Sequence, residues 1–161
     1  MASIISRHNN KILREQVLDA RCNCLPKDKA TCPLPGKCAT ESVIYRATVS
    51  TPNKVETYVG LTGGTFKKRY NKHMYDFRHP ESRISTKLSE YIWSLKDEGT
   101  SFNIKWDIVK KAPDYSPVSR KCNLCIEEKF EILFNPSTAT LNSRHELFSP
   151  CRHKRKKLLV K

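Results

Sequence analysis

Apolar and polar residues alternate in three segments of the chain, and this alternation predicts three β-strands. Residues 43–50 and 55–61 each place apolar or β-branched side chains at every second position. Residues 51–54 between them, Thr-Pro-Asn-Lys, have the composition of a turn, so the two strands should form a hairpin. Residues 102–109 alternate in the same way and predict a third strand.

A second periodicity, with apolar residues three and four positions apart, predicts helices over residues 66–77, 86–98 and 119–134. Thr65 offers an N-cap to the first helix, and Gly99 offers a stop to the second. Together these elements predict an α+β fold, with a small three-stranded, mainly antiparallel sheet flanked by helices.

The predicted hairpin carries two tyrosines, Tyr45 on the first strand and Tyr58 on the second. Tyr58 should point away from the apolar face of its strand, together with Gly60, which leaves open space two residues from this phenol. On the following helix Arg69 and His73 lie one turn apart at the edge of the buried stripe, so the helix should aim them across the sheet. Tyrosines are common in strands, so a chemical role depends on further residues completing a site.

The last predicted helix carries three glutamates in different environments. Glu127 and Glu131 share a polar sector, where solvated acids are expected. Glu128 follows Leu124 by four residues and precedes Ile132 by four, so it lies in the middle of an apolar stripe. Because an unpaired buried carboxylate is costly, Glu128 should have a partner. The alternatives are a structural ion pair, a hydrogen-bond network and a hard divalent cation such as Mg²⁺.

Seven cysteines, an odd number, disfavour a closed disulfide framework. Residues 22–40 are rich in proline and lysine and have almost nothing to bury, so a metal would have to supply the folding energy. This predicts an N-terminal zinc knuckle on Cys22, Cys24, Cys32 and Cys38. A second zinc site is predicted on Cys122, Cys125, Cys151 and His153, with His145 as the alternative fourth ligand.

The charge of the chain indicates its partner. Its 161 residues include 30 Lys and Arg against 16 Asp and Glu, a formal net charge of +14, which predicts a polyanion such as DNA. No apolar run approaches the roughly 20 residues of a membrane span, so no membrane partner is expected. The predicted nucleic-acid contacts are Lys67, Lys68, Lys72, Arg152, Lys154, Arg155, Lys156 and Lys157.

The cellular location is also an expectation from composition. The first 20 residues lack an apolar secretory segment, which predicts an intracellular chain with reduced thiols. The basic run at the end has the composition of a nuclear localisation signal, which predicts a nuclear protein.

Taken together, residues 43–145 resemble the GIY-YIG endonuclease family. Val-Ile-Tyr, ending at Tyr45, stands where the family has Gly-Ile-Tyr, and Tyr-Val-Gly, beginning at Tyr58, stands for Tyr-Ile-Gly. The helix that follows supplies the arginine of the family as Arg69, with His73 four residues later. Further along the chain, the metal-binding glutamate and the late asparagine of the family match Glu128 and Asn142. The cysteine-rich segment in front makes the chain most similar to the C-terminal endonuclease region of Penelope-like retroelements.

The resemblance implies a metal-dependent DNA endonuclease that hydrolyses phosphodiester bonds and nicks or cleaves target DNA for a retroelement. Glu128, or its neighbour Glu127, would hold Mg²⁺ or Mn²⁺, and two Zn²⁺ ions would be structural. Arg69 would stabilise the transition state, and either tyrosine would orient or deprotonate the attacking water. His73 would position a phosphate or relay a proton, and Asn142 would order the site by hydrogen bonding.

The resemblance also implies further partners and a division of the chain. The partners would be the reverse transcriptase region of the same polyprotein and the RNA of the element. The chain would comprise an N-terminal arm (1–21), the zinc knuckle (22–40), a nuclease-like domain (41–150) and a basic tail (151–161). The alternative functions are a non-catalytic, zinc-dependent nucleic-acid-binding module and an RNA-binding, ribosome-like accessory protein, and the latter does not account for Glu128.

Overall fold

The computed structural model describes residues 2–17, 22, 24–25, 30–113, 122–151 and 153. Its three strands form one antiparallel sheet in the order β2-β1-β3, built from β1 (Glu41–Ser50), β2 (Val55–Thr65) and β3 (Asn103–Lys111). Each strand covers its predicted segment to within a few residues, and β2 continues through Gly63 and Gly64 to Thr65. The α+β fold with a small three-stranded sheet is therefore confirmed.

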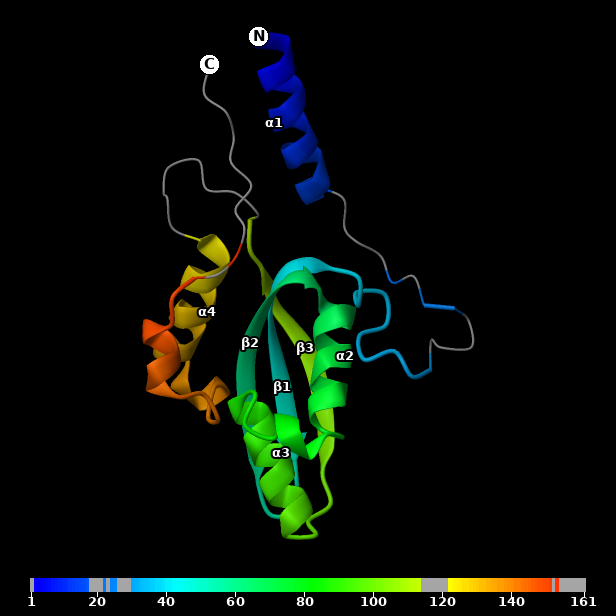
Figure 1. Cartoon of the computed structure of the whole chain (residues 1–161), viewed down its shortest axis with the longest axis vertical. Helices are drawn as coiled ribbons and strands as arrows, with labels where there is room; N and C mark the ends of the chain where they lie inside the picture. The colour runs from blue at the N-terminus through cyan, green and yellow to red at the C-terminus, as the bar shows by residue number, and fades with distance from the viewer. Residues whose placement is uncertain are drawn as a thin grey trace.

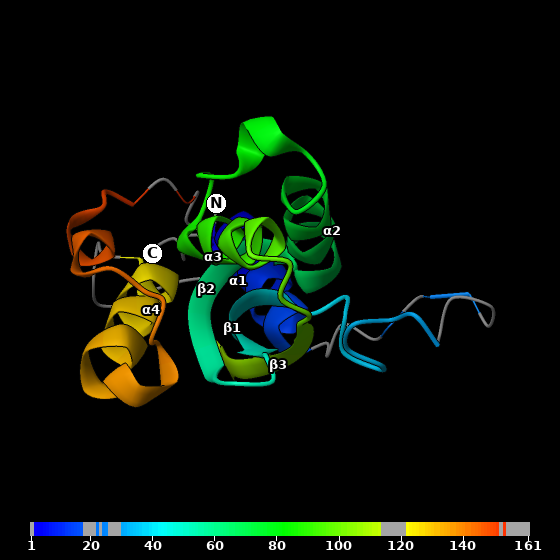
Figure 2. The same cartoon turned by 90° about the horizontal axis from the view of Figure 1, so that it is seen from below.

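Helices cover the sheet on both sides (Figures 1 and 2). The pair α2 (Phe66–Asp76) and α3 (Lys87–Asp97) lies on one face, and α4 (Asn123–Phe134) packs against β1 and β2 on the other. The predicted start of the last helix, residues 119–121, lies outside the described residues. Figure 1 shows α1 (Ala2–Val17) standing apart from the sheet at one end of the molecule. Within the described residues, no helix combines the length and apolar character that crossing a membrane requires.

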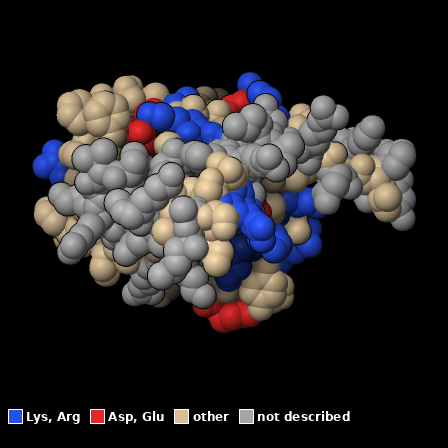
Figure 3. All heavy atoms as spheres, turned by 90° about the horizontal axis from the view of Figure 1, so that it is seen from above, with Lys and Arg blue, Asp and Glu red and all other residues tan. Residues whose placement is uncertain are grey.

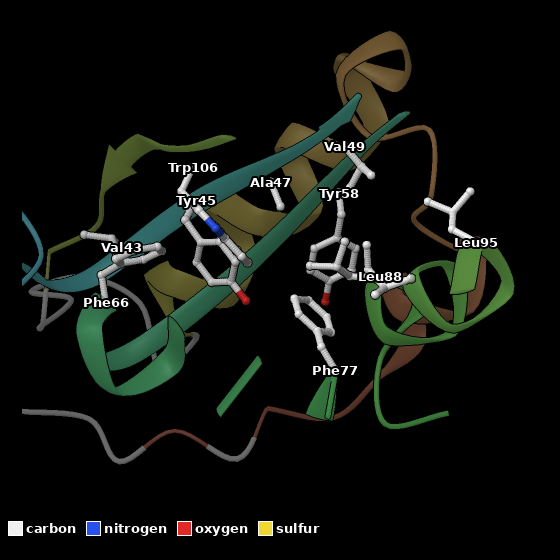
Figure 4. Packing of buried hydrophobic residues seen from close by; sticks show 11 residues of the cluster. Val43, Tyr45, Ala47, Val49, Tyr58, Phe66, Phe77, Leu88, Leu95 and Trp106 are labelled. Carbon is white, nitrogen blue, oxygen red and sulfur yellow. The ribbon is translucent and has the colours of Figure 1, made fainter. Parts of the chain in front are cut away.

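Two apolar clusters lie on opposite sides of the sheet. The cluster under α2 and α3 contains Tyr45, Tyr58, Phe66, Leu88 and Trp106, together with neighbours drawn in Figure 4. The cluster under α4 contains Ile44, Val59, Ala112, Leu124, Ile132 and Ala139. Because successive strand residues point to opposite faces, Tyr58 and Val59 belong to different clusters, as the alternation predicts.

The helix ends follow from local side-chain chemistry. The Thr65 hydroxyl accepts a hydrogen bond from the Lys68 amide (3.3 Å), which confirms Thr65 as the N-cap of α2. The Thr86 hydroxyl caps α3 in the same way, accepting from the Ser89 amide (3.0 Å). Gly99 adopts a φ of +67°, a conformation that glycine accepts without strain, just after α3 ends.

After α4 the chain returns along the free edge of β2. Two short 3-10 helices, η3 (Pro136–Thr138) and η4 (Arg144–Phe148), flank this return, and a third, η2 (Pro80–Ser82), joins α2 to α3. The Leu141 amide donates to the Thr57 carbonyl (2.9 Å), and the Thr57 amide donates to the Thr140 hydroxyl (2.8 Å). These bonds satisfy backbone N–H and C=O groups at the edge of β2, and they hold the segment before η4 beside the sheet.

Candidate active site

Tyr45 and Tyr58 lie side by side on the face of the sheet that α2 and α3 cover. Figure 4 shows both rings projecting from adjacent strands with their hydroxyl groups pointing the same way. Tyr45 is 0% exposed and Tyr58 is 6% exposed. The two phenols are therefore part of the core.

Gly60 makes room for the Tyr45 ring. The β1–β2 register pairs these two residues, and a Cβ added at Gly60 would lie 2.5 Å from the Tyr45 hydroxyl oxygen and 2.6 Å from the carbon that bears it. The expectation that Gly60 leaves open space is therefore wrong, because the Tyr45 phenol fills that space. Glycine is required here because no side chain fits between the backbone of β2 and this ring.

Replacing Gly60 with alanine should destabilise the fold by about 1–3 kcal/mol, because overpacking a filled core forces neighbours out of position. The free energy of unfolding in urea measures the effect. Gly64→Ala is the matched control, since the nearest atom to its added Cβ is the Thr62 hydroxyl oxygen at 4.0 Å. Equal stability of the Gly60 and Gly64 variants would contradict this account of the glycine.

Arg69 and His73 reach the Tyr45 hydroxyl from α2, as the sequence predicts. The Arg69 Nε donates to the Tyr45 oxygen at 2.9 Å, and the His73 Nε2 lies 2.7 Å from the same oxygen. The one-turn spacing of the two residues places both on the side of α2 that faces the sheet. His73 is only 1% exposed, and its Nε2 contacts the equally buried Tyr45 hydroxyl.

The protonation states of this group follow from burial and from the nearby guanidinium. Burial, with the positive charge of Arg69, lowers the pKa of His73 to about 3, so the imidazole is neutral at pH 7. Burial raises the pKa of Tyr45 to about 12 and that of Tyr58 well above its usual value, although Arg69 opposes both shifts. Because the Tyr45 oxygen accepts from Arg69, its own hydrogen is available to donate to the His73 Nε2. Both tyrosines are neutral hydrogen-bonding groups in this arrangement.

Glu128 on α4 and Glu146 on η4 act on this group through their charge. Both negative charges contribute to the raised pKa values of the two phenols. Burial, together with the charge of Glu146, raises the pKa of Glu128 to about 7, and Arg69 acts in the opposite direction. Glu128 is half-buried and, within the described part of the chain, forms no hydrogen bond or ion pair.

Glu127 and Glu131 are both committed to ion pairs with the sheet. Glu127 accepts from the Lys110 Nζ on β3 (2.7 Å), and Glu131 pairs with the Arg46 guanidinium on β1 (3.5 Å). The expectation that these two are solvated acids is therefore wrong, because the strands beneath α4 supply basic partners. Among the three glutamates of α4, Glu128 is therefore the one whose carboxylate has no ion-pair partner in the described part of the chain.

Asn142 holds η4 against β2. Its Oδ1 accepts from the Val59 amide (2.7 Å), and its Nδ2 donates to the Val59 carbonyl (2.8 Å) and to the Glu146 carboxylate (2.7 Å). Asn142 thus ties Glu146 to the edge of β2, next to Tyr58 in sequence. The sequence analysis did not identify Glu146. A signal was present, because Ser143 and Glu146 have the three-residue spacing of a capping box, which they form at the start of η4.

The four N-terminal cysteine sulfurs gather as a metal site requires. They lie within 4.8 Å of one another, and three of the sulfur–sulfur distances are 3.2, 3.7 and 3.7 Å. A tetrahedral zinc ion with Zn–S bonds of about 2.3 Å would place them about 3.8 Å apart. The cluster is fixed on the start of α2, where the Lys67 amide donates to the Cys38 carbonyl (2.7 Å) and its Nζ donates to the Cys24 sulfur (3.3 Å).

The second group is formed by Cys122, Cys125, Cys151 and His153, whose ligand atoms also lie within 4.8 Å of one another. The His153 Nδ1 is 3.9, 3.1 and 3.7 Å from the sulfurs of Cys122, Cys125 and Cys151, and tetrahedral Zn–S and Zn–N bonds predict about 3.6 Å. His145 is exposed on η4 and does not join the group. Of the two candidate histidines, His153 is therefore the one that completes the cluster. Both clusters could bind zinc.

The second cluster is close to the active-site elements. Gly63 of β2 lies against it, since a Cβ there would meet the His153 ring at 3.4 Å. Cys122 and Cys125 lie at the start of α4, and Glu128 follows Cys125 by less than one turn. A metal bound here would therefore fix the end of the helix that carries Glu128.

The predicted basic contacts are only partly described. Lys68 and Lys72 are exposed on the outer face of α2, while Lys67 is half-buried against the first cysteine cluster. Figure 3 shows Lys and Arg side chains outweighing acidic ones on the face that it presents. The remaining predicted contacts lie outside the described residues: Arg152, Lys154, Arg155, Lys156 and Lys157.

The chain matches no family model, no curated protein and no solved structure. Its own residues therefore carry the functional argument. Arg69 and His73 of α2 contact the Tyr45 hydroxyl on β1, and Tyr58 on β2 and the unpaired Glu128 on α4 interact with this group electrostatically.

Proposed function

We propose that this chain is a metal-dependent DNA endonuclease of the GIY-YIG type, which nicks or cleaves phosphodiester bonds for a Penelope-like retroelement. The observation that carries the proposal is Glu128, a half-buried carboxylate that forms no ion pair among the described residues and interacts electrostatically with Arg69 and both tyrosines. A structural glutamate in this position would be expected to form an ion pair, as Glu127 and Glu131 do.

The carboxylates near the tyrosines suit a hard divalent cation. Mg²⁺ and Mn²⁺ prefer oxygen ligands and are commonly held by one or two carboxylates, with water and phosphate oxygens completing the shell. Glu128 would be the principal ligand, with Glu146 adding negative charge beside it. When bound, the ion would polarise the scissile phosphate and stabilise the leaving oxygen.

Arg69 supplies the fixed positive charge of the site. Its Nε is committed to the Tyr45 hydroxyl and the guanidinium also interacts with Tyr58, so its remaining N–H groups would contact a substrate phosphate. Because the guanidinium is held before the substrate arrives, it can stabilise the charge on the pentacoordinate transition state without reorganisation.

The two tyrosines would orient the attacking water rather than act as ready-made bases. Burial keeps both phenols protonated at neutral pH, so each can donate or accept a hydrogen bond without carrying charge. His73 would be a positioning residue, since its Nε2 fixes the direction of the Tyr45 hydroxyl. Deprotonation of water by either tyrosine would require the bound cation to lower a phenol pKa that burial has raised.

The cysteine clusters would contribute two structural Zn²⁺ ions. The first would fold the knuckle onto the start of α2, which carries Arg69, and the second would fix the start of α4, which carries Glu128. DNA would be the partner of the basic surface, and a nuclear location with a reverse transcriptase region and element RNA as further partners would follow from a retroelement role.

Metal analysis of the purified chain should find two zinc ions. His153→Ala should reduce this number to one, because its Nδ1 lies among the three sulfurs of the second cluster. His145→Ala should leave both ions in place and is the matched control, since His145 is exposed and outside the cluster. A loss of zinc from the His145 variant with none from the His153 variant would contradict the assignment.

A second candidate function is a non-catalytic, zinc-dependent nucleic-acid-binding module. The raised pKa values of Tyr45 and Tyr58 favour it, because a general base needs a pKa lowered toward neutrality and burial shifts both phenols the other way. The same charge and the same cysteine clusters would serve binding alone.

Nicking of supercoiled plasmid by the zinc-loaded chain separates the two functions. A nuclease should convert the plasmid to nicked circles or linear DNA when Mg²⁺ or Mn²⁺ is added, and should leave it intact without either ion. Tight DNA binding with no metal-dependent cleavage would overturn the proposal and support the binding module.

A further inference from the structure

A cavity of about 560 Å³ lies between the first cysteine cluster and α2, away from the tyrosines. Lys67, Asn71, Met74, Tyr75, Arg78 and His79 form its α2 side, and the knuckle residues around Cys24 and Cys32 form the other. Its volume is within the range of about 300–1,000 Å³ that is usual for sites that bind small organic groups. None of the described residues that line it is acidic.

The cavity and the candidate active site occupy opposite sides of α2. Lys67, Asn71 and Met74 recur at a spacing of four and three residues, so they share one face of the helix. Arg69 and His73 lie roughly 200° and 240° around the helix from Lys67 at 100° per residue, on the face that contacts Tyr45. The cavity is therefore a separate feature, about one helix diameter (~10 Å) from the tyrosines.

Two stacked rings form an aromatic surface at the cavity. Tyr75 and His79 stack with ring centroids 3.7 Å apart and an angle of 13° between the planes. The His79 Nδ1 lies 2.8 Å from the Tyr75 carbonyl oxygen, which holds the second ring in place. Tyr75 remains 47% exposed, so the pair is both ordered and accessible.

Positive charge surrounds this surface. The Lys72 Nζ lies 5.1 Å from the centre of the Tyr75 ring, and Arg78 is exposed at the cavity. In the described part of the chain, the Arg78 guanidinium makes no hydrogen bond or ion pair. Lys72 is paired with Asp76 and Lys67 donates to the Cys24 sulfur, so Arg78 is the cation that is left for a ligand. An exposed aromatic stack beside such a guanidinium is an arrangement that proteins use to bind unpaired bases and their phosphates.

We propose that this cavity binds an unpaired nucleotide of a nucleic-acid strand. The base would stack on Tyr75, and the phosphate would contact Arg78. This inference rests on the proposed function only in taking a nucleic acid as the partner. It adds that the chain holds a single-stranded segment of that nucleic acid beside the cleavage site.

Fluorescence anisotropy with labelled oligonucleotides tests the proposal on the zinc-loaded full chain. The probes are a short single-stranded DNA, the RNA of the same sequence and the blunt DNA duplex. The Tyr75→Ala/Arg78→Ala variant should bind a single strand about tenfold more weakly, and the duplex less than twofold more weakly. A selective loss for the DNA or for the RNA strand supports the proposal and identifies the strand that the cavity holds.

The matched control is Phe134→Ala/Lys105→Ala, which removes an exposed aromatic ring and one positive charge on α4 and β3. This variant should bind all three probes like the wild type. Equal weakening on single strands and duplex by the Tyr75/Arg78 variant would overturn the proposal, and so would no weakening at all. Anisotropy measures binding and not cleavage. The result can therefore support or overturn this proposal even if the chain fails to nick plasmid DNA.

Discussion

Replacing Glu128 with glutamine should reduce metal-dependent plasmid nicking by at least about 100-fold while leaving the fold intact. A metal ion contributes several kcal/mol of charge stabilisation to a transition state, and each 1.36 kcal/mol is a factor of ten in rate. Glutamine keeps the size and hydrogen-bonding capacity of the side chain but removes the negative charge that would hold Mg²⁺. Single-turnover nicking with excess protein measures the change without interference from product release.

Glu127→Gln is the control for this prediction. Glu127 precedes Glu128 on the same helix and loses the same charge when substituted, but its carboxylate pairs with Lys110 on β3. This variant should nick within about twofold of the wild-type rate, because exposed ion pairs contribute little to stability. If the Glu128 variant still nicks plasmid and the Glu127 variant does not, the metal ligand is Glu127 and not Glu128.

Replacing Arg69 with alanine should lower the single-turnover nicking rate by about 10²–10³-fold. Loss of one preorganised group that stabilises transition-state charge has an effect of this size in other enzymes. The Tyr45 hydroxyl would also lose the donor that orients it at 2.9 Å, so the two effects act in the same direction. Arg69→Lys should recover only part of the rate, since an ammonium group cannot contact the phenol and a phosphate with the same geometry.

Lys68→Ala is the control for charge alone. Lys68 is next to Arg69 in sequence, is exposed, and lies on the outer face of α2. Its loss should weaken DNA binding modestly and leave the rate at saturating protein unchanged. Equal loss of single-turnover rate in the Lys68 and Arg69 variants would show that Arg69 acts as a general phosphate contact and not in the transition state.

The elements and the faces of the sheet could be predicted because they depend on local periodicity. Alternation located the strands and assigned Tyr58 and Val59 to opposite faces, and the one-turn spacing of Arg69 and His73 placed both toward the sheet. Glu128 was recognised because an acid interrupts an apolar stripe whose other members, Leu124 and Ile132, are buried.

Features that depend on contacts between distant segments could not be predicted in the same way. The role of Gly60 depends on the register that brings it opposite Tyr45 on β1. The ion pairs of Glu127 and Glu131 depend on which strands lie beneath α4. Glu146 reaches the site only because the chain returns along β2, and nothing within η4 itself indicates that return.

Titration of Mn²⁺ into the zinc-loaded chain, with the unbound ion measured by electron paramagnetic resonance, tests the central claim most directly. The wild type and Glu127→Gln should each bind one Mn²⁺ ion that Mg²⁺ displaces, and Glu128→Gln should lose that ion while keeping both zinc ions. Unchanged Mn²⁺ binding in the Glu128 variant, or no Mn²⁺ site in the wild type, would contradict the assignment of Glu128 as the ligand of a catalytic metal.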